Sequence, residues 1–452
     1  MTEETKAPNL TYEDLNLPNY INTRHVLAGL NVADLAKAAV IAGLNLLLVG
    51  DTGTGKTQLA KDIYNGFFRG NKAEGGHGVF VKANPEIDIN NEIFTRLNID
   101  RAQRERTQAL DSLVYFVDEI NRAPPIAQNQ FFGLGDGNMD YQGRDIPIGK
   151  DGYHLLIATA NMGNGEFSGT FDSDKALLNR LHVAIDLEHC PFKPTYGDKQ
   201  EIRARKANPN VLSAPKRDIT DKILAVSREI SDKTANIDLE TRAVLDYLEF
   251  GLQNCQKYPL TGKDRAWPMV CQGCEHNKEG DNKGKDALCS QVRAPETRTM
   301  EVVRKYALAL EYLAKLKDPS VKVESYELIF KAFELTGAYQ HLLNPVRLRD
   351  HYGHNPRLMA EVVKDLQADY EKARPYILTS LEMAGQGKGE TVFFNRGEQF
   401  GLYNALSDKA KKSVGAAISP FSNQRAIGLG WVNNLVELTI KESEKRLRSQ
   451  LT

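Results

Sequence analysis

The stretch that decides the fold reads Asn45-Leu46-Leu47-Leu48-Val49-Gly50-Asp51-Thr52-Gly53-Thr54-Gly55-Lys56-Thr57. Its first five residues form a short apolar run, and a helical pattern follows from Thr57 to Phe68. The loop in between fits G-x-x-x-x-G-K-[ST]. A buried strand before this pattern and a helix after it are the context that a phosphate-binding loop requires. A chance match on a glycine-rich turn is the alternative, and the flanking strand and helix argue against it.

Each residue type in this loop has a physical reason to bind nucleotide phosphates. Glycines allow the backbone to curl so that its N–H groups point at the phosphates. The N-terminus of the following helix adds positive potential there. Lys56 can reach the β- and γ-phosphates, and the Thr57 hydroxyl can ligate Mg²⁺. We therefore expect residues 50–57 to bind ATP, with Thr57 as one magnesium ligand.

A second strand end carries two carboxylates. The apolar run from Leu113 to Val117 is followed directly by Asp118 and Glu119. Asp118 stands where a carboxylate can ligate the magnesium ion beside the phosphates. Glu119 can polarise the attacking water as a general base. An acidic pair in a solvated turn is the more common situation, but a buried strand that ends in two carboxylates downstream of a phosphate loop is a specific combination.

Apolar runs and helical patterns alternate over the first part of the chain. The remaining apolar runs predict strands at residues 79–81, 155–158 and 183–187. Strands that alternate with helices favour a parallel sheet in an α/β domain. After about Pro191 helical patterns dominate. The expected parts are an α/β nucleotide-binding domain (1–190), a helical lid (191–345) with a Cys-rich insertion (256–290), and a helical C-terminal extension (346–452).

The composition sets limits on location and partners. The chain has 58 Lys and Arg against 59 Asp and Glu, so no overall field attracts nucleic acid or an anionic membrane. The first ten residues contain no apolar run that resembles a signal peptide. No apolar stretch is long enough to cross a bilayer. We expect a cytoplasmic protein with no membrane partner, whose five cysteines are thiols or metal ligands rather than disulfides.

The residues around the acidic pair form a recognisable signature. Residues 118–125 read Asp-Glu-Ile-Asn-Arg-Ala-Pro-Pro, and Gln128 follows. An expected helix at 130–135 and an expected β-hairpin at 138–148 come next. This arrangement resembles the MoxR family of AAA+ ATPases, and the resemblance extends over about residues 20–345. It implies a P-loop AAA+ core with a parallel sheet, followed by an α-helical lid.

The resemblance implies a motor that hydrolyses ATP with Mg²⁺. Such ATPases work as rings of identical subunits, and we expect a hexamer here. Family members remodel or activate a protein client, often a metal-containing enzyme, and often work with a partner that bears a von Willebrand A domain. For this chain the client and that partner are expectations by analogy.

The resemblance also gives roles to other polar residues. Asn161 becomes the sensor-1 residue, whose amide orients water near the γ-phosphate. Arg180 becomes the arginine finger, which stabilises transition-state charge in the neighbouring subunit's site. Family members usually have Asp-Arg-Phe at the finger, where this chain has Asn-Arg-Leu. The lid lacks the family's Ser-Pro-Arg motif, and Arg298 is the favoured sensor-2 residue, with Arg293 as the alternative. A solvated arginine at a helix start is the other reading of both.

Four of the five cysteines gather around the hydrophilic insertion: Cys255, Cys271, Cys274 and Cys289. Four thiolates suit a tetrahedral Zn²⁺ site, which could supply folding energy to a segment with little core of its own. The same thiolates could hold an iron–sulfur cluster, or could remain unligated. We favour zinc, in a role that braces the lid or offers a surface to a partner. Cys190 stands apart and is expected to be a buried thiol.

Two other functions are consistent with the sequence. One is a motor for DNA or RNA remodelling, whose mark would be ATPase stimulation by nucleic acid with steeply salt-dependent binding. The near-neutral charge and the lack of a recognisable reader domain argue against it. The other is a nucleotide-gated scaffold that binds ATP with little turnover. The presence of Glu119, Asn161 and Arg180 argues against that role.

Overall fold

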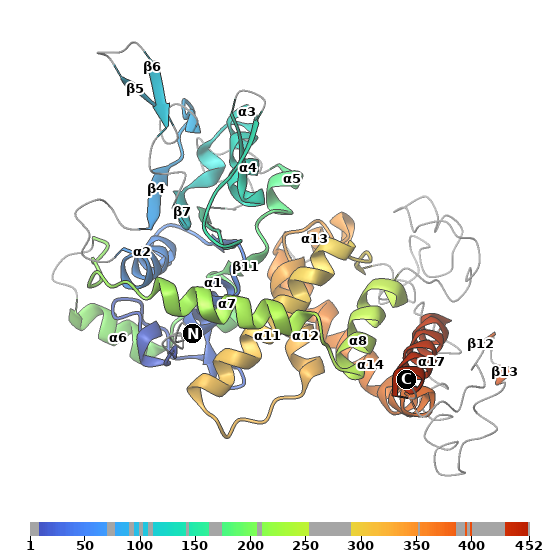
Figure 1. The fold of residues 1–452 in the computed structure, drawn as a ribbon. Coiled ribbons are helices and arrows are strands. Elements are labelled where there is room, and N and C mark those ends of the chain that lie inside the picture. Colours follow the sequence, from blue (N-terminus) through green and yellow to red (C-terminus); the bar gives the residue numbers. More distant parts are fainter. Residues whose placement is uncertain are drawn as a thin grey trace. The chain divides into compact units, whose positions relative to one another are not determined.

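The computed structural model describes most of the chain (Figure 1). The described residues are 9–69, 77–89, 95–98, 103–106, 112–141, 144–161, 174–205, 210–252, 291–350, 353–385, 394–395, 398–399 and 430–450. The chain divides into two compact units. Unit 1 comprises Met1–Ala235 and Val302–Val323, and unit 2 comprises Asn236–Glu301 and Glu324–Thr452. The boundary at residue 301 falls within helix α11 (Thr297–Lys317).

Unit 1 is built on a five-stranded sheet in which every neighbouring pair of strands is parallel. In spatial order the strands are β11 (Val183–Asp186), β3 (Leu46–Val49), β10 (Leu155–Ala160), β7 (Val114–Asp118) and β4 (Gly78–Lys82). The first three are buried at every residue, as expected for a parallel sheet covered on both faces. β4 lies at an edge and is only partly buried. The predicted α/β fold with a parallel sheet is confirmed, and each of the five strands corresponds to a predicted apolar run.

Helix α1 (Val32–Ala42) is buried along its whole length. It begins at a capping box, in which the Asn31 side chain accepts from the Asp34 N–H and the Asp34 carboxylate accepts from the Asn31 N–H. It ends at Gly43, whose φ of 65° suits a left-handed helix cap. The other longer helices that lie within unit 1 are α2 (Lys56–Phe67), α6 (Tyr196–Arg205) and α7 (Thr220–Thr234).

Short elements precede, connect and follow the strands of this sheet. They are β1 (His25–Leu27), β2 (Leu30–Asn31), β5 (Thr95–Asn98), β6 (Gln103–Arg106), η4 (Ile120–Arg122), α3 (Pro125–Gln128), α4 (Gln130–Asp136), β8 (Asn138–Tyr141), β9 (Arg144–Pro147), α5 (Lys175–Leu178), η1 (Glu13–Leu15) and η5 (Cys190–Phe192). Helix α4 and the antiparallel pair β8–β9 agree with the expected helix and hairpin. The antiparallel pair β5–β6 was not expected, because Thr-Arg-Leu-Asn and Gln-Arg-Glu-Arg are mostly polar and contain only one β-branched and one apolar residue, Thr95 and Leu97.

Unit 2 is mainly helical. Its elements besides the first residues of α11 are α8 (Leu239–Asp246), the π-helical η6 (Tyr247–Gly251), α12 (Ser325–Gly337), α13 (Pro345–Asp350), α14 (Asn355–Gly385), β12 (Phe394–Asn395), β13 (Glu398–Gln399) and α17 (Gly430–Gln450). Its core contains the rings of Tyr247, Phe330 and Tyr370, which lie 5.4–6.3 Å apart between centroids. Helix α8 begins at Leu239 because the side chain of Asp238 accepts from the Thr241 N–H and caps its first turn.

Several sequence predictions meet different outcomes. Cys190 is exposed at the start of η5, so the prediction of a buried thiol is wrong. Helices in the described residues lack any apolar stretch long enough to cross a bilayer. Compact units need not coincide with functional domains, so the three-part division at residues 190 and 345 stays a prediction.

Candidate functional site

The loop between β3 and α2 is curled as a phosphate-binding loop requires. Gly53 and Gly55 have φ of 84° and 96°, in the left-handed region that favours glycine. A Cβ at Gly50 would lie 2.9 Å from the Thr54 hydroxyl, so a larger residue there would push into the loop. Gly55 is the N-cap of α2, so the N–H groups of the first turn of this helix, which have no partner within the helix, lie next to the loop. Glycine therefore stands where the backbone needs a positive φ, as at Gly53 and Gly55, or where a side chain would collide with the loop, as at Gly50.

Lys56 lies at the centre of this curl. Its side chain is 7% exposed, and its Nζ donates to the carbonyl oxygens of Gly50 at 2.7 Å and Asp51 at 2.8 Å. Burial lowers the pKa of Lys56, while the nearby carboxylates of Asp51 and Asp118 act in the opposite direction. The loop thus surrounds a buried cation that can exchange its carbonyl partners for phosphate oxygens.

Thr57 and Asp118 come together although they lie 61 residues apart in the chain. The Thr57 hydroxyl donates to Asp118 Oδ1 at 3.2 Å, and the Thr159 hydroxyl donates to the same oxygen at 2.7 Å. A hydroxyl and a carboxylate in contact are the oxygen ligands that Mg²⁺ prefers beside phosphates, so the donor set fits that ion. Thr159 was not predicted, and its only sign in the sequence is a hydroxyl within the apolar run of β10.

Glu119 leaves the strand in an unusual conformation. Its φ of 57° lies in the left-handed region, which is strained for a residue with a side chain. Its N–H donates to the Thr159 hydroxyl at 2.8 Å, which fixes its backbone to β10. Its carboxylate, 22% exposed, pairs with the Nε of Arg122 at 3.0 Å. The turn therefore directs this carboxylate out of the sheet while its backbone stays anchored.

Asn161, just beyond β10, lies beside the segment that follows Glu119. Asn121 donates from its side chain to the Asn161 carbonyl at 2.8 Å, and Asn121 Oδ1 accepts from the Asn161 N–H at 3.4 Å. Asn161 Oδ1 itself is buried and has no hydrogen-bond partner among the described residues. A buried amide oxygen left without a partner calls for a water or a ligand group as donor. This is what an amide that orients water would need.

Arg180 is held by three groups of the same chain. Its Nε pairs with Asp136 Oδ2 at 2.7 Å, its Nη1 donates to the Ala176 carbonyl at 2.9 Å, and its guanidinium carbon lies 4.6 Å from the centre of the Phe132 ring. A Cβ at Gly135 would lie 2.8 Å from the Cβ of Arg180, so glycine permits this close approach to α4. The side chain remains 21% exposed. These three partners were not predicted.

The two candidates for sensor 2 lie in unit 2. Arg298 is exposed in the first turn of α11. Arg293 is half-buried, and its Nε has no hydrogen-bond partner within the described residues. The role of either arginine at the phosphate loop of unit 1 stays a prediction.

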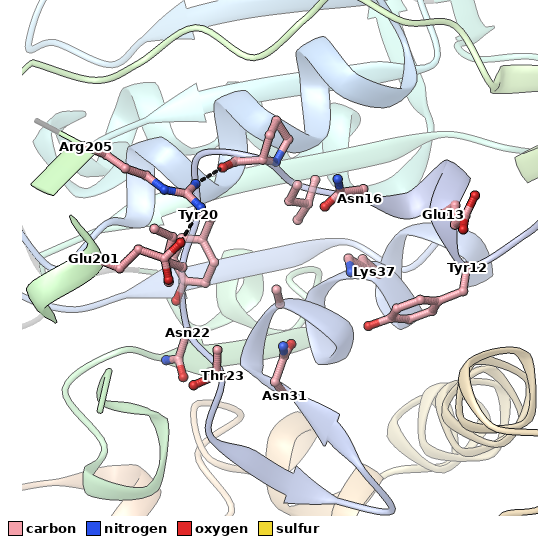
Figure 2. Close-up of a pocket in the computed structure, with 14 residues that line it drawn as sticks. Tyr12, Glu13, Asn16, Tyr20, Asn22, Thr23, Asn31, Lys37, Glu201 and Arg205 are labelled. Carbon is pink, nitrogen blue, oxygen red and sulfur yellow. Dashed lines mark hydrogen bonds and ion pairs between the residues drawn. The ribbon is translucent and has the colours of Figure 1, made fainter. Parts of the chain in front are cut away.

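A pocket of about 770 Å³ lies between the N-terminal segment, the start of α1 and α6 (Figure 2). Arg205 and Glu201 form an ion pair on one side of it, while Lys37 and Tyr12 lie on the other. Tyr20 joins this pocket to the phosphate loop, because its ring would lie 3.3 Å from a Cβ at Gly55. The apolar part of the lining comes from Leu17, Pro18, Ile21 and Ala33.

The four cysteines predicted to bind zinc or an iron–sulfur cluster, Cys255, Cys271, Cys274 and Cys289, lie outside the described residues. Among the residues that are described, no three or more His, Cys, Asp or Glu side chains cluster as they would around a metal ion. A metal at the insertion therefore stays a prediction.

Comparison with known proteins finds one matching family and several structures of similar fold. Residues 45–181 match the model of an AAA domain of the dynein-related subfamily. A candidate ATPase from Cytophaga hutchinsonii is 16% identical over 73% of this chain and 87% of its own, with a TM-score of 0.51. A full-length MCM homolog from Methanopyrus kandleri is 12% identical over 68% of this chain and 55% of its own, with a TM-score of 0.40. The first of these likenesses concerns the fold alone. A search of curated proteins gave no match.

Proposed function

We propose that the AAA domain at residues 45–181 hydrolyses ATP with Mg²⁺, as one subunit of a MoxR-type ring. One observation carries this proposal. At the end of the sheet the Thr57 and Thr159 hydroxyls both donate to Asp118 Oδ1. The N–H of Glu119 donates to the same Thr159 hydroxyl. In open α/β sheets the carboxyl ends of the strands are where ligands bind. The family match to an AAA domain supports the same assignment.

Each side chain has a defined task in this reaction. Lys56 binds the β- and γ-phosphates. Thr57 and Asp118 would hold the magnesium ion, which when bound would supply positive charge to the phosphate oxygens. Glu119 accepts a proton from the attacking water. Asn161 orients that water through its side-chain amide, whose Oδ1 is buried without a partner among the described residues.

We assign the base and ribose of the nucleotide to the pocket beside Tyr20. Its volume of about 770 Å³ is in the range of small-molecule sites, and its lining combines apolar side chains with a few polar groups. Tyr20 and Asn19 are held in place because their N–H groups donate to the Asp62 carboxylate on α2 at 3.0 and 2.9 Å. The N-terminal segment is thereby tied to the helix that begins at the phosphate loop.

The proposed role of Arg180 requires that subunits assemble. Arg180 acts on the nucleotide of a neighbouring subunit, because an arginine finger stabilises charge that develops in the transition state. The subunits form a homo-oligomer, expected to be a hexamer. Hydrolysis drives remodelling or activation of a protein client, and a von Willebrand A domain protein is the expected class of partner.

Steady-state ATP hydrolysis measured against protein concentration tests this proposal, with Glu119→Gln as the matched control. Glutamine keeps the shape of the side chain but cannot accept the proton. We expect a rate per subunit that rises with concentration in the wild type, and a variant that binds ATP without turnover. Wild-type protein that binds ATP with negligible turnover at every concentration would instead favour a nucleotide-gated scaffold. Turnover that appears only with added DNA would favour a nucleic-acid motor.

A further inference from the structure

Gln128 ends the signature quoted above, and the proposed reaction gives this residue no task. It ends helix α3 and is fully buried. Its side-chain Nε2 donates to the carbonyl of Ala123 at 2.9 Å, and its Oε1 accepts from the N–H of Asp174 at 2.8 Å. A glutamine amide is one of the few groups that can donate at one end and accept at the other. Gln128 therefore joins two backbone segments that are 51 residues apart.

One of these segments belongs to the catalytic carboxylate. Ala123 closes the 3₁₀ turn that Glu119 opens, since the Arg122 N–H donates to the Glu119 carbonyl and the Ala123 N–H donates to the Ile120 carbonyl. The turn is short, so a shift of Glu119 must move Ala123 or strain the turn between them. The buried Ala123 carbonyl carries any such shift to Gln128.

The other segment belongs to the finger. Asp174 caps α5, accepting from the Ala176 N–H at 2.6 Å through its side chain. The Ala176 carbonyl in turn accepts from Arg180 Nη1 at 2.9 Å. Arg180 is thus positioned by a short helix whose capping residue, Asp174, is hydrogen-bonded to Gln128. The chain of contacts runs from Glu119 to Arg180 within one subunit.

We infer that Gln128 is a positioning residue that couples the Glu119 segment of a subunit to the arginine that the same subunit offers to its neighbour. The inference rests on the proposed function, since it needs Arg180 to act in the next subunit's site. A change at one nucleotide site would then alter the finger presented to the next, which provides a physical route for neighbouring subunits to act in turn. Gln128 contacts no nucleotide in this scheme and acts only through Arg180.

Mixed rings test the inference directly. An acceptor subunit carries Arg180→Ala and keeps Glu119, and a donor subunit carries Glu119→Gln and keeps Arg180. Each is inactive alone, and their mixture regains hydrolysis where a donor finger meets an acceptor site. Gln128→Met is then added to one partner at a time, because methionine has a similar length and shape but makes neither hydrogen bond. We expect the regained activity to fall at least about tenfold when Gln128→Met is in the donor, and by no more than about twofold when it is in the acceptor.

Gln130→Met in the same two positions is the matched control. Gln130 lies on α4 and accepts from the Ile89 N–H at 2.7 Å, outside the Ala123 and Asp174 bridge. Its substitution should affect donor and acceptor equally. Should Gln128→Met fail to fold, Gln128→Ala serves in its place, since alanine makes neither hydrogen bond and leaves room for water at the two backbone groups.

The outcomes separate the two proposals. If the unmodified pair regains no activity, the finger does not act between subunits, and the proposed ring mechanism fails together with this inference. If the pair regains activity but Gln128→Met lowers it equally in donor and acceptor, the proposed function stands and Gln128 has only a structural role. A loss confined to the acceptor would likewise overturn the coupling to Arg180.

Discussion

Two arginines, one in each unit, are held by similar partners but lie in different surroundings. Arg180 of unit 1 pairs with one carboxylate, Asp136, and stacks on Phe132. Arg374 of unit 2 pairs with two carboxylates, Glu240 and Glu324, and its guanidinium carbon lies 4.7 Å from the centre of the Tyr326 ring. Both combine an ion pair with an aromatic face.

The two arginines differ in the hydrogen-bond donors that remain available to another molecule. Arg374 joins α14 to α8 and to the residue before α12, and its charge is more than balanced within unit 2. At Arg180 the Nη2 donates to no residue that the structure describes, and one carboxylate balances one charge. A guanidinium with a free edge on a fixed scaffold suits recognition of an anion, whereas one that is shared between two acids suits helix packing. Contacts alone therefore do not distinguish the two arginines, whereas their unused donors do.

If Arg180 is the arginine finger proposed above, its removal is expected to have the largest effect. Arg180→Ala should lower kcat by about 10³-fold while nucleotide affinity changes little, since an arginine finger acts on charge that appears in the transition state. Hydrolysis and fluorescent-nucleotide binding check this, with Arg374→Ala as the matched substitution in unit 2. Equal kcat losses from the two substitutions would break the distinction between the arginines.

Loss of the charged partner that holds Arg180 should lower kcat less than loss of Arg180 itself. Asp136→Asn keeps an acceptor for Arg180 Nε but removes the charge, so we expect kcat to fall about tenfold with an unchanged KM. Thermal unfolding of the same variant supplies the control, because the pair is partly exposed and contributes little to stability. A rise in KM without a fall in kcat would show that Asp136 serves ground-state binding instead.

The unit 2 arginine should show the reverse pattern. Arg374→Ala is expected to lower the free energy of unfolding by about 1 kcal/mol, because it breaks a partly exposed network rather than a buried pair. Hydrolysis per assembled subunit should stay unchanged. Urea unfolding, read beside the ATPase rate, measures both quantities. A loss of turnover greater than the loss of folded protein would give Arg374 a functional role.

Unit 2 also contains a carboxyl group whose pKa is raised. Burial, with a contribution from Glu249, raises the pKa of Asp246 to about 6. A raised pKa in the folded state means that the stabilising contribution is full below about pH 4 and is lost as the pH rises through 6. Asp246→Asn should therefore raise stability at pH 7 by about 1 kcal/mol, after allowance for partial exposure, and flatten the dependence between pH 4 and 7. Thermal unfolding at a series of pH values checks this, and a variant with the wild-type pH dependence would contradict it.

The Cys-rich insertion is likewise expected to have little effect on turnover. If Cys255, Cys271, Cys274 and Cys289 bind zinc, chelation should lower the thermal unfolding temperature and leave hydrolysis nearly unchanged, because the metal stabilises a segment and takes no part in the reaction. Metal analysis of the purified protein establishes which ion is bound. If ATPase, assembly and thermal stability all stayed the same after metal removal, the bracing role would be excluded.

The sequence predicts the central sheet because each strand is a distinct apolar run next to turn or loop residues. It predicts the phosphate loop because all eight residues of the pattern, from Gly50 to Thr57, are consecutive. The contacts of Thr159, Asp136 and Gln128 were not predicted, since each joins segments 40 or more residues apart and no local periodicity reports such pairs. The same reason hid the boundary within α11, a helix whose pattern is continuous although its residues belong to two units.

The shared active site is the central claim, and mixing the two inactive variants tests it most directly. Arg180→Ala and Glu119→Gln are purified separately and combined in equal amounts, and ATP hydrolysis is measured after subunit exchange. In a head-to-tail ring about one interface in four would pair an intact Glu119 with an intact Arg180, so we predict roughly a quarter of the wild-type rate. A mixture as inactive as its parts, in rings shown to contain both variants, would contradict the account.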